Sequence, residues 1–313
     1  MRNLFWPAFL GSLFLVLVVI PVLLVRWHSR RIPVDRDRRR FLQRAALYPA
    51  ALAAAGAYGT QYEPYHTVEN RYTVPAGGGF PPGYRIAQIS DVHLGRFFDL
   101  EDLRRLLDHI AADGPDMLAI TGDLFDDEER NAEAAKVLDA YCASFPDGIW
   151  FCLGNHEHFR GLEAIKAMLA KTKVHTLYNE AGKVEGRGFW VAGVDYPMQH
   201  EKQEFQRLKQ EFLAKAVEKI PQEERASTIL LAHHPEFIDN AAEEELALAL
   251  TGHTHGGQIG ILGVSLFPVF KYMRGFVRIG ETLGYVHCGN GSWFPCRIGC
   301  PPETAYFTIA PKE

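Results

Sequence analysis

Five short segments of the sequence concentrate side chains that bind metal ions, and each follows an apolar run. They are 91–93 (Asp-Val-His), 122–126 (Gly-Asp-Leu-Phe-Asp), 154–157 (Gly-Asn-His-Glu), 233–235 (His-His-Pro) and 252–257 (Gly-His-Thr-His-Gly-Gly). One such segment alone is ordinary, because an Asp or a His after a strand is often only a cap or turn residue. Five of them predict one shared site. A mixture of carboxylate and imidazole ligands suits manganese, iron or zinc better than calcium or magnesium.

The elements that must position these segments alternate between strand and helix from residue 84 onward. Strands are predicted over 85–90, 117–121, 149–153, 189–194, 228–232, 246–251, 285–288 and 305–309. Helices are predicted over 100–112, 131–142, 162–171 and 201–219. This alternation predicts an α/β protein with substantial parallel sheet. In such sheets ligands gather at the carboxyl ends of the strands, which is where the five segments fall.

Taken in order, the five segments resemble the calcineurin-like metallophosphoesterase superfamily, over roughly residues 84–309. The resemblance implies a two-sheet αββα sandwich and two divalent metal ions. The first ion would be held by Asp91, His93, Asp123 and His255. The second would be held by Asp123, Asn155, His233 and His253, so that Asp123 bridges the two. The family pattern His-x-Pro selects His233 rather than His234, and His156 would be the non-ligand histidine that faces the substrate.

The resemblance also implies a dinuclear-metal hydrolase that cleaves a phosphodiester or pyrophosphate bond by attack of a metal-activated hydroxide. His156 would donate a proton or hydrogen bond to the leaving oxygen. Asp126 is expected to support a ligand histidine, and Glu157 and His158 to orient His156 or to face solvent. A membrane-tethered binding module that has lost catalysis is the rival hypothesis. The presence of all seven ligands and of His156 argues against it.

Two further stretches resemble a bacterial membrane-linked branch of this superfamily: 256–258 (Gly-Gly-Gln) and 297–303 (Arg-Ile-Gly-Cys-Pro-Pro-Glu). That branch contains phosphodiesterases and UDP-2,3-diacylglucosamine pyrophosphatases of lipid A biosynthesis. The segment 261–278 mixes large apolar residues with basic ones. It predicts either a loop that binds lipid or the membrane interface, or a hairpin that buries alternate residues. Candidate contacts to the substrate phosphate are Lys271, Arg274 and Arg297.

The N-terminal 60 residues are predicted to be a membrane anchor. Residues 4–25 are uncharged and long enough to span a bilayer, which takes about 20 residues. By the positive-inside rule the Arg-rich stretch 26–40 stays cytoplasmic. Residues 37–43 (Asp-Arg-Arg-Arg-Phe-Leu-Gln) resemble a twin-arginine export signal, and residues 41–59 are either the apolar part of that signal or a second membrane segment. Residues 61–83 are predicted to be a linker, and residues 84–313 the phosphoesterase domain.

Both interpretations of residues 41–59 place that domain on the outer side of the bacterial inner membrane. If this segment does not insert, the domain stays in the cytoplasm, where UDP-linked acyl-glucosamine is made. An outward domain therefore favours a phosphodiesterase acting on a lipid or small phosphorylated substrate at the membrane surface, with the pyrophosphatase as the alternative.

The charge of the chain argues against a nucleic-acid-binding protein, and its cysteines argue against a disulfide framework or a zinc knuckle. Residues 1–44 carry nine Arg and two Asp, so the formal net charge of -5 leaves -12 on the remaining chain. A domain this acidic repels polyphosphate backbones, which argues against general nucleic-acid binding. The five cysteines form no Cys-x-x-Cys pair. They therefore predict buried free thiols, with a Cys296–Cys300 disulfide as the alternative.

Overall fold

The computed structural model describes residues 15, 19–29, 36–45, 47–76, 79–199, 201–292 and 294–311. They belong to two compact units, residues 1–62 and 63–313. In the first unit the structure describes the helices α2 (Ile20–Ser29), α3 (Arg36–Ala45) and α4 (Leu47–Gln61). None of the helices in the described ranges combines the length and the apolar character needed to cross a bilayer. Most of the predicted span 4–25 lies outside these ranges.

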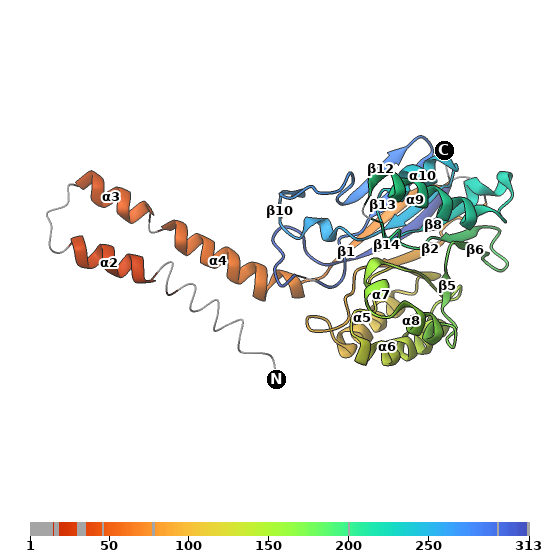
Figure 1. Ribbon diagram of the computed structural model, residues 1–313, viewed down its shortest axis with the longest axis horizontal. Coiled ribbons are helices and arrows are strands. Elements are labelled where there is room, and N and C mark those ends of the chain that lie inside the picture. Colours follow the sequence, from red (N-terminus) through yellow and green to blue (C-terminus); the bar gives the residue numbers. More distant parts are fainter. Residues whose placement is uncertain are drawn as a thin grey trace. The chain divides into compact units, whose positions relative to one another are not determined.

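The second unit contains two six-stranded sheets, and Figure 1 labels several of their strands. The first sheet has the order β1 (Val68–Ala76), β14 (Glu303–Pro311), β2 (Arg85–Ile89), β3 (Met117–Thr121), β4 (Ile149–Cys152) and β5 (His175–Leu177). The second has the order β12 (Gly275–Ile279), β13 (Thr282–Val286), β9 (Leu248–Thr251), β8 (Thr228–Leu231), β7 (Trp190–Gly193) and β6 (Glu180–Lys183). Four neighbouring strands run parallel in each sheet, β2 to β5 in one and β7, β8, β9 and β13 in the other.

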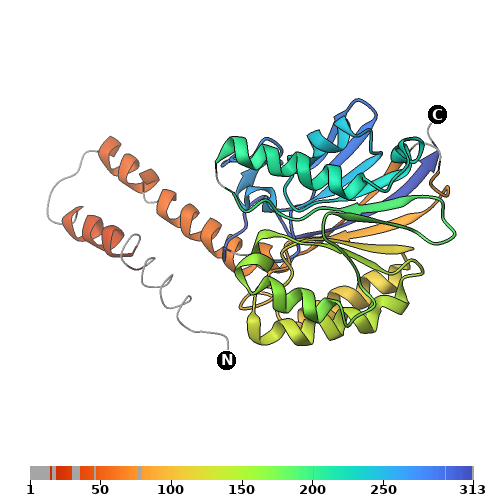
Figure 2. The ribbon, with the colours of Figure 1, turned by 45° about the vertical axis from the view of Figure 1, so that its right-hand side comes forward.

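Helices cover the outer face of each sheet, as Figure 2 shows. The first sheet packs against α5 (Leu100–Asp113), α6 (Glu128–Tyr141) and α8 (Leu162–Leu169), and the second against α9 (Lys202–Val217) and α10 (Phe237–Glu243). A third apolar cluster fills the space between the sheets, with residues such as Ile86 and Cys152 from one and Ile229 and Leu250 from the other. The predicted two-sheet αββα sandwich is therefore confirmed.

The structure differs from the sequence-based expectation at residues 61–83. The segment predicted to be a linker contains β1, which pairs in parallel with β14 along its full length. β1 (Val-Glu-Asn-Arg-Tyr-Thr-Val-Pro-Ala) lies at the edge of the sheet, beside a Gly-rich stretch. Its residues alternate between buried or partly buried and exposed, but its sequence does not alternate cleanly between apolar and polar residues. A half-buried edge strand of this kind gives a weaker signal than the continuous apolar runs of the central strands.

A buried cross-link aligns the ends of the two sheets. Gln88 on β2 donates from Nε2 to the Oγ1 of Thr121 on β3 and to the backbone oxygen of Thr251 on β9, each at 3.0 Å. The ring Nδ1 of His233, just beyond β8, lies 2.7 Å from the backbone oxygen of Thr121. These contacts bring the carboxyl ends of β3, β8 and β9 to one place.

Candidate metal centre

The predicted ligands all follow the carboxyl ends of strands that meet at this place. Five of them have a left-handed backbone, with φ between 48° and 73°: Asp91, His93, Asp123, His253 and His255. This region is uncommon for residues other than glycine, and such strain gathers at functional sites. The sharp turn directly after each strand points the side chain across the strand ends instead of along the sheet faces.

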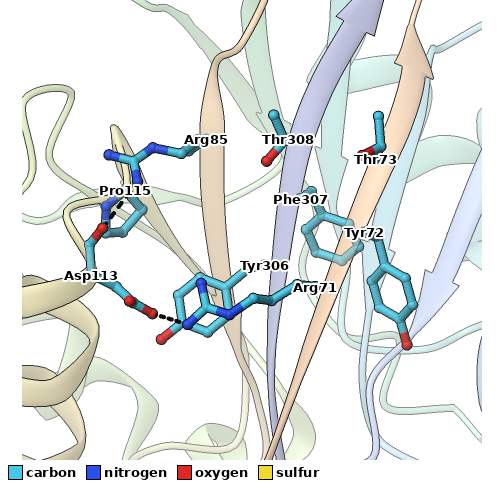
Figure 3. Close-up of a pocket in the computed structure, with 9 residues that line it drawn as sticks. All are labelled: Arg71, Tyr72, Thr73, Arg85, Asp113, Pro115, Tyr306, Phe307 and Thr308. Carbon is cyan, nitrogen blue, oxygen red and sulfur yellow. Dashed lines mark hydrogen bonds and ion pairs between the residues drawn. The ribbon is translucent and has the colours of Figure 1, made fainter.

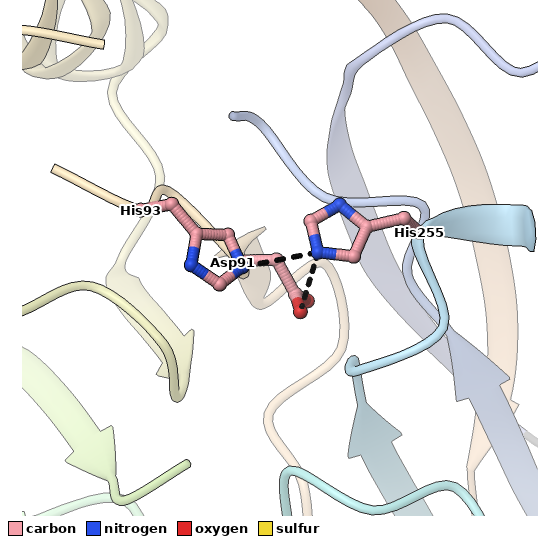
Figure 4. A group of neighbouring side chains, drawn as sticks. All are labelled: Asp91, His93 and His255. Carbon is pink, nitrogen blue, oxygen red and sulfur yellow. Dashed lines mark hydrogen bonds and ion pairs between the residues drawn. The ribbon is translucent and has the colours of Figure 1, made fainter. Parts of the chain in front are cut away.

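The first group joins Asp91, His93 and His255, all buried. Figure 4 shows the carboxylate and the two imidazole rings turned toward one another. Nε2 of His255 lies 3.0 Å from Nε2 of His93 and 3.4 Å from Oδ1 of Asp91. The other oxygen, Oδ2 of Asp91, accepts a hydrogen bond from Ser90 Oγ at 2.6 Å, which fixes the orientation of the carboxylate.

The second group joins Asp123, His233 and His253. Oδ2 of Asp123 lies 3.1 Å from Nε2 of His233, and this nitrogen lies 3.1 Å from Nδ1 of His253. The same Oδ2 is 3.7 Å from Nε2 of His93 in the first group. Asp123 therefore stands between the two groups, as the bridging role requires.

Asn155 adds an amide at the end of β4. Its Oδ1 is buried, and within the part of the chain that the structure describes it accepts no hydrogen bond. A buried polar atom without a partner is costly unless a water or an ion satisfies it. This orphaned oxygen, with the imidazole nitrogens and carboxylates around it, fits the predicted pair of divalent cations.

The charges of the two groups depend on one another. Burial alone would raise the pKa of Asp123, but the facing imidazoles of His233 and His93 lower it below its ordinary value. Burial alone would lower the pKa of His233, while Asp123 and Asp91 raise it to about 10. Burial, with the neighbouring His233, lowers the pKa of His253 to about 3. The negative charge of the carboxylates is thus concentrated where cations would bind.

Asp126 lies beside two histidines, one of which is the ligand histidine that it was predicted to support. Its Oδ2 lies 3.2 Å from Nδ1 of His93, and its Oδ1 lies 2.8 Å from Nδ1 of His156. Arg160 donates from Nε to the same Oδ1 at 2.8 Å. The side chain of His156 is partly exposed, and its Nε2 is 4.0 Å from Oδ2 of Asp123. A single carboxylate thus orients one predicted ligand and the histidine predicted to face the substrate.

Glu157 and His158 do not orient His156 as expected. Glu157 is fully buried, and its carboxylate accepts hydrogen bonds from four backbone amides. Those amides belong to Asp123 (3.0 Å), Leu124 (2.8 Å), Phe125 (2.9 Å) and Gly154 (2.7 Å). His158 lies 2.7 Å from Oδ1 of Asp195 instead. The local cause is α7 (Asn155–Phe159), a one-turn helix that directs Glu157 into the protein.

Tyr196 is a site residue that the sequence reasoning missed. Its hydroxyl lies 3.3 Å from Nε2 of His253, the nitrogen on the far side of the ring from His233. Burial raises the pKa of Tyr196 to about 12, so the phenol keeps its proton. Tyr196 follows β7, whose carboxyl end lies at the same edge of the sheet as those of β8 and β9. This position after a strand was the feature of the sequence that could have identified it. Tyr196 therefore positions the His253 ring.

Replacing Tyr196 by phenylalanine removes this hydroxyl and leaves the ring. We expect the Mn²⁺ requirement to rise by about tenfold, since partners of metal-binding histidines typically contribute 10–100-fold in affinity. The measurement is activity against Mn²⁺ concentration. Tyr141→Phe is the matched control, because that hydroxyl bonds Asp108 in the helical layer. An unchanged Mn²⁺ requirement would show that the Tyr196 hydroxyl has no such role.

The three predicted phosphate contacts lie in different surroundings. Lys271 is exposed, with both oxygens of Asp239 at 2.8 Å. Arg274 donates to the backbone oxygen of Gly299 at 3.1 Å. Arg297 is 0% exposed, which leaves it no surface to offer a substrate.

Arg297 instead holds the structure around a predicted ligand. Its Nη2 lies 3.0 Å from Nδ1 of His255, and its Nη1 donates to the backbone oxygens of Cys288 and Cys300 at 2.9 Å. Since a guanidinium only donates, Nδ1 of His255 accepts this bond and the ring is fixed with Nε2 toward Asp91.

All five cysteines are free, so the alternative Cys296–Cys300 disulfide is absent.

A hollow at the opposite edge of the first sheet is unrelated to these groups. Figure 3 shows it between the start of β2, the strands β1 and β14, and the end of α5. Its two arginines are engaged, Arg71 with Asp113 and Arg85 with the backbone oxygens of Asp113 and Gly114. It therefore offers no unpaired cation to a phosphate.

Known proteins similar to this chain include phosphoesterases. The family model for calcineurin-like phosphoesterases matches residues 84–257. The metallophosphoesterase YkuE of Bacillus subtilis (strain 168) is 29% identical over 290 residues, which cover 87% of this chain and 97% of that protein. Phosphodiesterase YaeI of Escherichia coli (strain K12) is 27% identical over 289 residues, which cover 87% and 99%. The Haemophilus influenzae NAD nucleotidase NadN has a TM-score of 0.44 and 16% identity, covering 66% of this chain and 45% of that one.

Because the family model matches more than half of its residues, this chain belongs to the calcineurin-like phosphoesterase family. It is a metal-dependent phosphoester hydrolase. The predicted family and enzyme class are therefore confirmed, and the rival hypothesis of a binding module without catalysis is set aside.

Proposed function

We propose that this enzyme hydrolyses a phosphodiester of a membrane-associated or lipid-linked substrate, using two divalent cations, with manganese as the preferred metal and iron or zinc as alternatives. The observation that carries the proposal is that two groups of ligands share Asp123 and lie beside His156. The relative named as a phosphodiesterase supports a diester as the bond cleaved. A mixed carboxylate and imidazole donor set supports the choice of metals.

The metal ligands and His156 have different roles in the proposed reaction. When bound, the two cations would supply Lewis-acid chemistry, lowering the pKa of a shared water and offsetting the charge of the phosphate. In this proposal His156 acts on the leaving oxygen, with its Nδ1 2.8 Å from Oδ1 of Asp126 and its Nε2 4.0 Å from Oδ2 of Asp123. Burial alone would lower the pKa of His156, but the hydrogen bond to Asp126 and the charge of Asp123 raise it. This direction favours the protonated imidazole that a general acid needs.

Replacing His156 by alanine tests this role. We expect kcat on bis(p-nitrophenyl) phosphate to fall by about 10²-fold, the lower end of the usual contribution of a general acid. The loss should be larger for a diester with a poor leaving group, because that group needs the proton more. The readout is the ratio of the two losses, with His109→Ala on α5 as the control. Equal losses on both diesters would assign His156 to phosphate binding instead of proton donation.

The substrate proposal rests on the apolar and basic segment 261–278, which closely follows the loop of His253 and His255. UDP-2,3-diacylglucosamine pyrophosphatase activity is the second candidate, since that substrate combines acyl chains with a pyrophosphate. Assays of the full chain with Mn²⁺, on bis(p-nitrophenyl) phosphate and on UDP-diacylglucosamine, distinguish the two. Hydrolysis of the diester without the UDP-lipid supports the phosphodiesterase, and specific cleavage of the UDP-lipid supports the pyrophosphatase. Inactivity on both, with metals bound, rejects both substrates.

We also propose that residues 1–60 anchor the enzyme in the bacterial inner membrane with the catalytic domain outside. The support is the uncharged run 4–25, the Arg-rich stretch 26–40 and the twin-arginine-like segment 37–43. Protease added to spheroplasts should digest the catalytic domain. Protection of the domain until the membrane is lysed would place it in the cytoplasm, which is the location the pyrophosphatase requires.

A further inference from the structure

The segment that follows the metal-binding loop exposes large apolar side chains. β10 (Gly260–Ile261) and β11 (Val264–Ser265) form a two-stranded hairpin, and residues 266–269 continue from it. The exposed fractions are 60% for Ile261, 98% for Leu262, 68% for Val264, 50% for Leu266, 58% for Phe267 and 76% for Val269. Contiguous exposed apolar side chains of this kind mark sites of interaction with proteins, membranes or ligands. We call residues 261–269 the apolar tip.

The turn of this hairpin is not explained by folding alone. Leu262 and Gly263 occupy its two central positions with φ of 51° and 82°. Two-residue turns with positive φ at both positions favour Asn-Gly or Asp-Gly, since a branched side chain is strained there. Leucine at this place is disfavoured by the backbone and gains nothing from burial. Its side chain is therefore available to a partner outside the domain.

We propose that the apolar tip inserts into the surface of an anionic lipid bilayer and thereby holds the metal centre at the level of the lipid headgroups. Residues 261–278 contain Lys271, Arg274 and Arg278 and no acidic residue, whereas the chain beyond residue 44 has a net charge of -12. Lys271 is paired with Asp239, so the positive charge offered to a membrane comes from Arg274 and from the exposed Arg278. An apolar projection flanked by basic residues complements an anionic membrane surface.

The tip is joined to the metal-binding loop at its base. The ring of Phe270 lies 4.8 Å from that of His253, between ring centroids. Thr254, between the two ligand histidines, donates from Oγ1 to the backbone oxygen of Met273 at 2.6 Å. Insertion of the tip would therefore fix the distance of the ligands from the membrane.

The chain enters the second unit beside the same hairpin. The carboxylate of Glu63, the first residue of that unit, accepts from the backbone amides of Gly299 and Cys300 at 3.0 and 2.8 Å. The amide of Gly260 at the base of the hairpin donates to the backbone oxygen of Ile298 at 2.7 Å. The connection to the proposed membrane anchor and the apolar tip thus share one end of the domain. The inference that this end faces the membrane rests in part on the proposed anchor. The exposed apolar side chains of the tip support it independently.

A probe at the tip tests insertion in the full chain. Leu262→Cys labelled with NBD is reconstituted with vesicles of phosphatidylcholine and phosphatidylglycerol, and the unsubstituted chain gives the background from native thiols. We expect a blue-shifted emission that nitroxide-labelled lipids quench, whereas Lys136→Cys on α6 gives a water-like, unquenched signal. Water-like emission at position 262 overturns the proposal. A blue shift that lipid nitroxides do not quench overturns it too, because protein would then cover the tip, either a second copy or another segment of this chain.

Activity measurements separate this proposal from the proposed reaction. Leu262→Asp should lower hydrolysis of an acylated chromogenic phosphodiester in the vesicle by about tenfold or more, from the lost burial of one leucine. It should leave hydrolysis of soluble bis(p-nitrophenyl) phosphate unchanged. Equal rates on the vesicle substrate for both chains would contradict insertion. Inactivity of the unsubstituted chain on both substrates would reject the proposed function, while the fluorescence result would still decide whether the tip inserts.

Discussion

Asp123→Asn is expected to lower kcat/KM for bis(p-nitrophenyl) phosphate by about three orders of magnitude or more, because bound metals contribute several kcal/mol of transition-state stabilisation. The substitution keeps the shape of the side chain and removes its negative charge. Oδ2 of Asp123 is close to both ligand groups, 3.1 Å from Nε2 of His233 and 3.7 Å from Nε2 of His93. The family resemblance assigns only Asp123 to both metals, so its loss should weaken both sites together.

Two measurements accompany the rate. Metal analysis after gel filtration in Mn²⁺ should find two ions per chain in the unsubstituted enzyme and a lower content in Asp123→Asn. Asp108→Asn, an exposed carboxylate on α5, controls for the general effect of removing a negative charge. Full metal content together with full activity in Asp123→Asn would contradict the shared-ligand arrangement. Loss of activity with both metals retained would move the role of Asp123 from binding the metals to the reaction itself.

The positions of the strand ends explain why the ligand groups could be predicted from sequence. The central strands β2, β3, β4, β8 and β9 are short and buried along nearly their whole length. Polar residues directly after them gather where their carboxyl ends meet. Asp91, Asp123 and His253 lie there as expected. What the sequence does not carry is the path of a side chain after the turn. Glu157 follows Asn155 by two residues, yet the single turn of α7 directs it away from the site.

Contacts made by residues far apart in the sequence were out of reach for the same reason. Tyr196 contacts His253, 57 residues later, and Arg297 contacts His255, 42 residues earlier. Arg297 is basic and follows an apolar segment, which is the pattern of a phosphate contact as well as of a buried support. Only its burial decides between these roles. The edge strand β1 was not predicted either, since it pairs with β14, more than 200 residues later in the sequence.

Glu157→Gln is expected to destabilise the fold by about 3–5 kcal/mol, because it replaces one carboxylate oxygen with an NH₂ group facing buried N–H donors. In the structure one oxygen accepts from the amides of Leu124 and Phe125, and the other from those of Asp123 and Gly154. The amide side chain can satisfy only one of these pairs. The other pair loses its acceptor in a site that water does not reach.

The measurement is the urea midpoint of unfolding with and without Mn²⁺. Glu163→Gln is the matched control, because that side chain on α8 is 88% exposed and should change stability by less than about 0.5 kcal/mol. Without metal we expect the midpoint of Glu157→Gln to fall well below that of the control. With Mn²⁺ both midpoints should rise, but the rise should be smaller for Glu157→Gln. Its weakened loops hold Asp123, so ligand binding to the folded state stabilises that state less.

An unchanged midpoint in Glu157→Gln would mean that the four amides find other acceptors, and that the carboxylate is not what orders these loops. A lower midpoint with an unchanged Mn²⁺ effect would separate stability from metal binding. Glu157 would then support the sandwich without shaping the site. We expect both the midpoint and the effect of Mn²⁺ on it to fall. Glu157 joins the loop after β3 to the loop after β4, and these two loops carry Asp123 and Asn155. The same four hydrogen bonds therefore hold the fold and place two of the ligands.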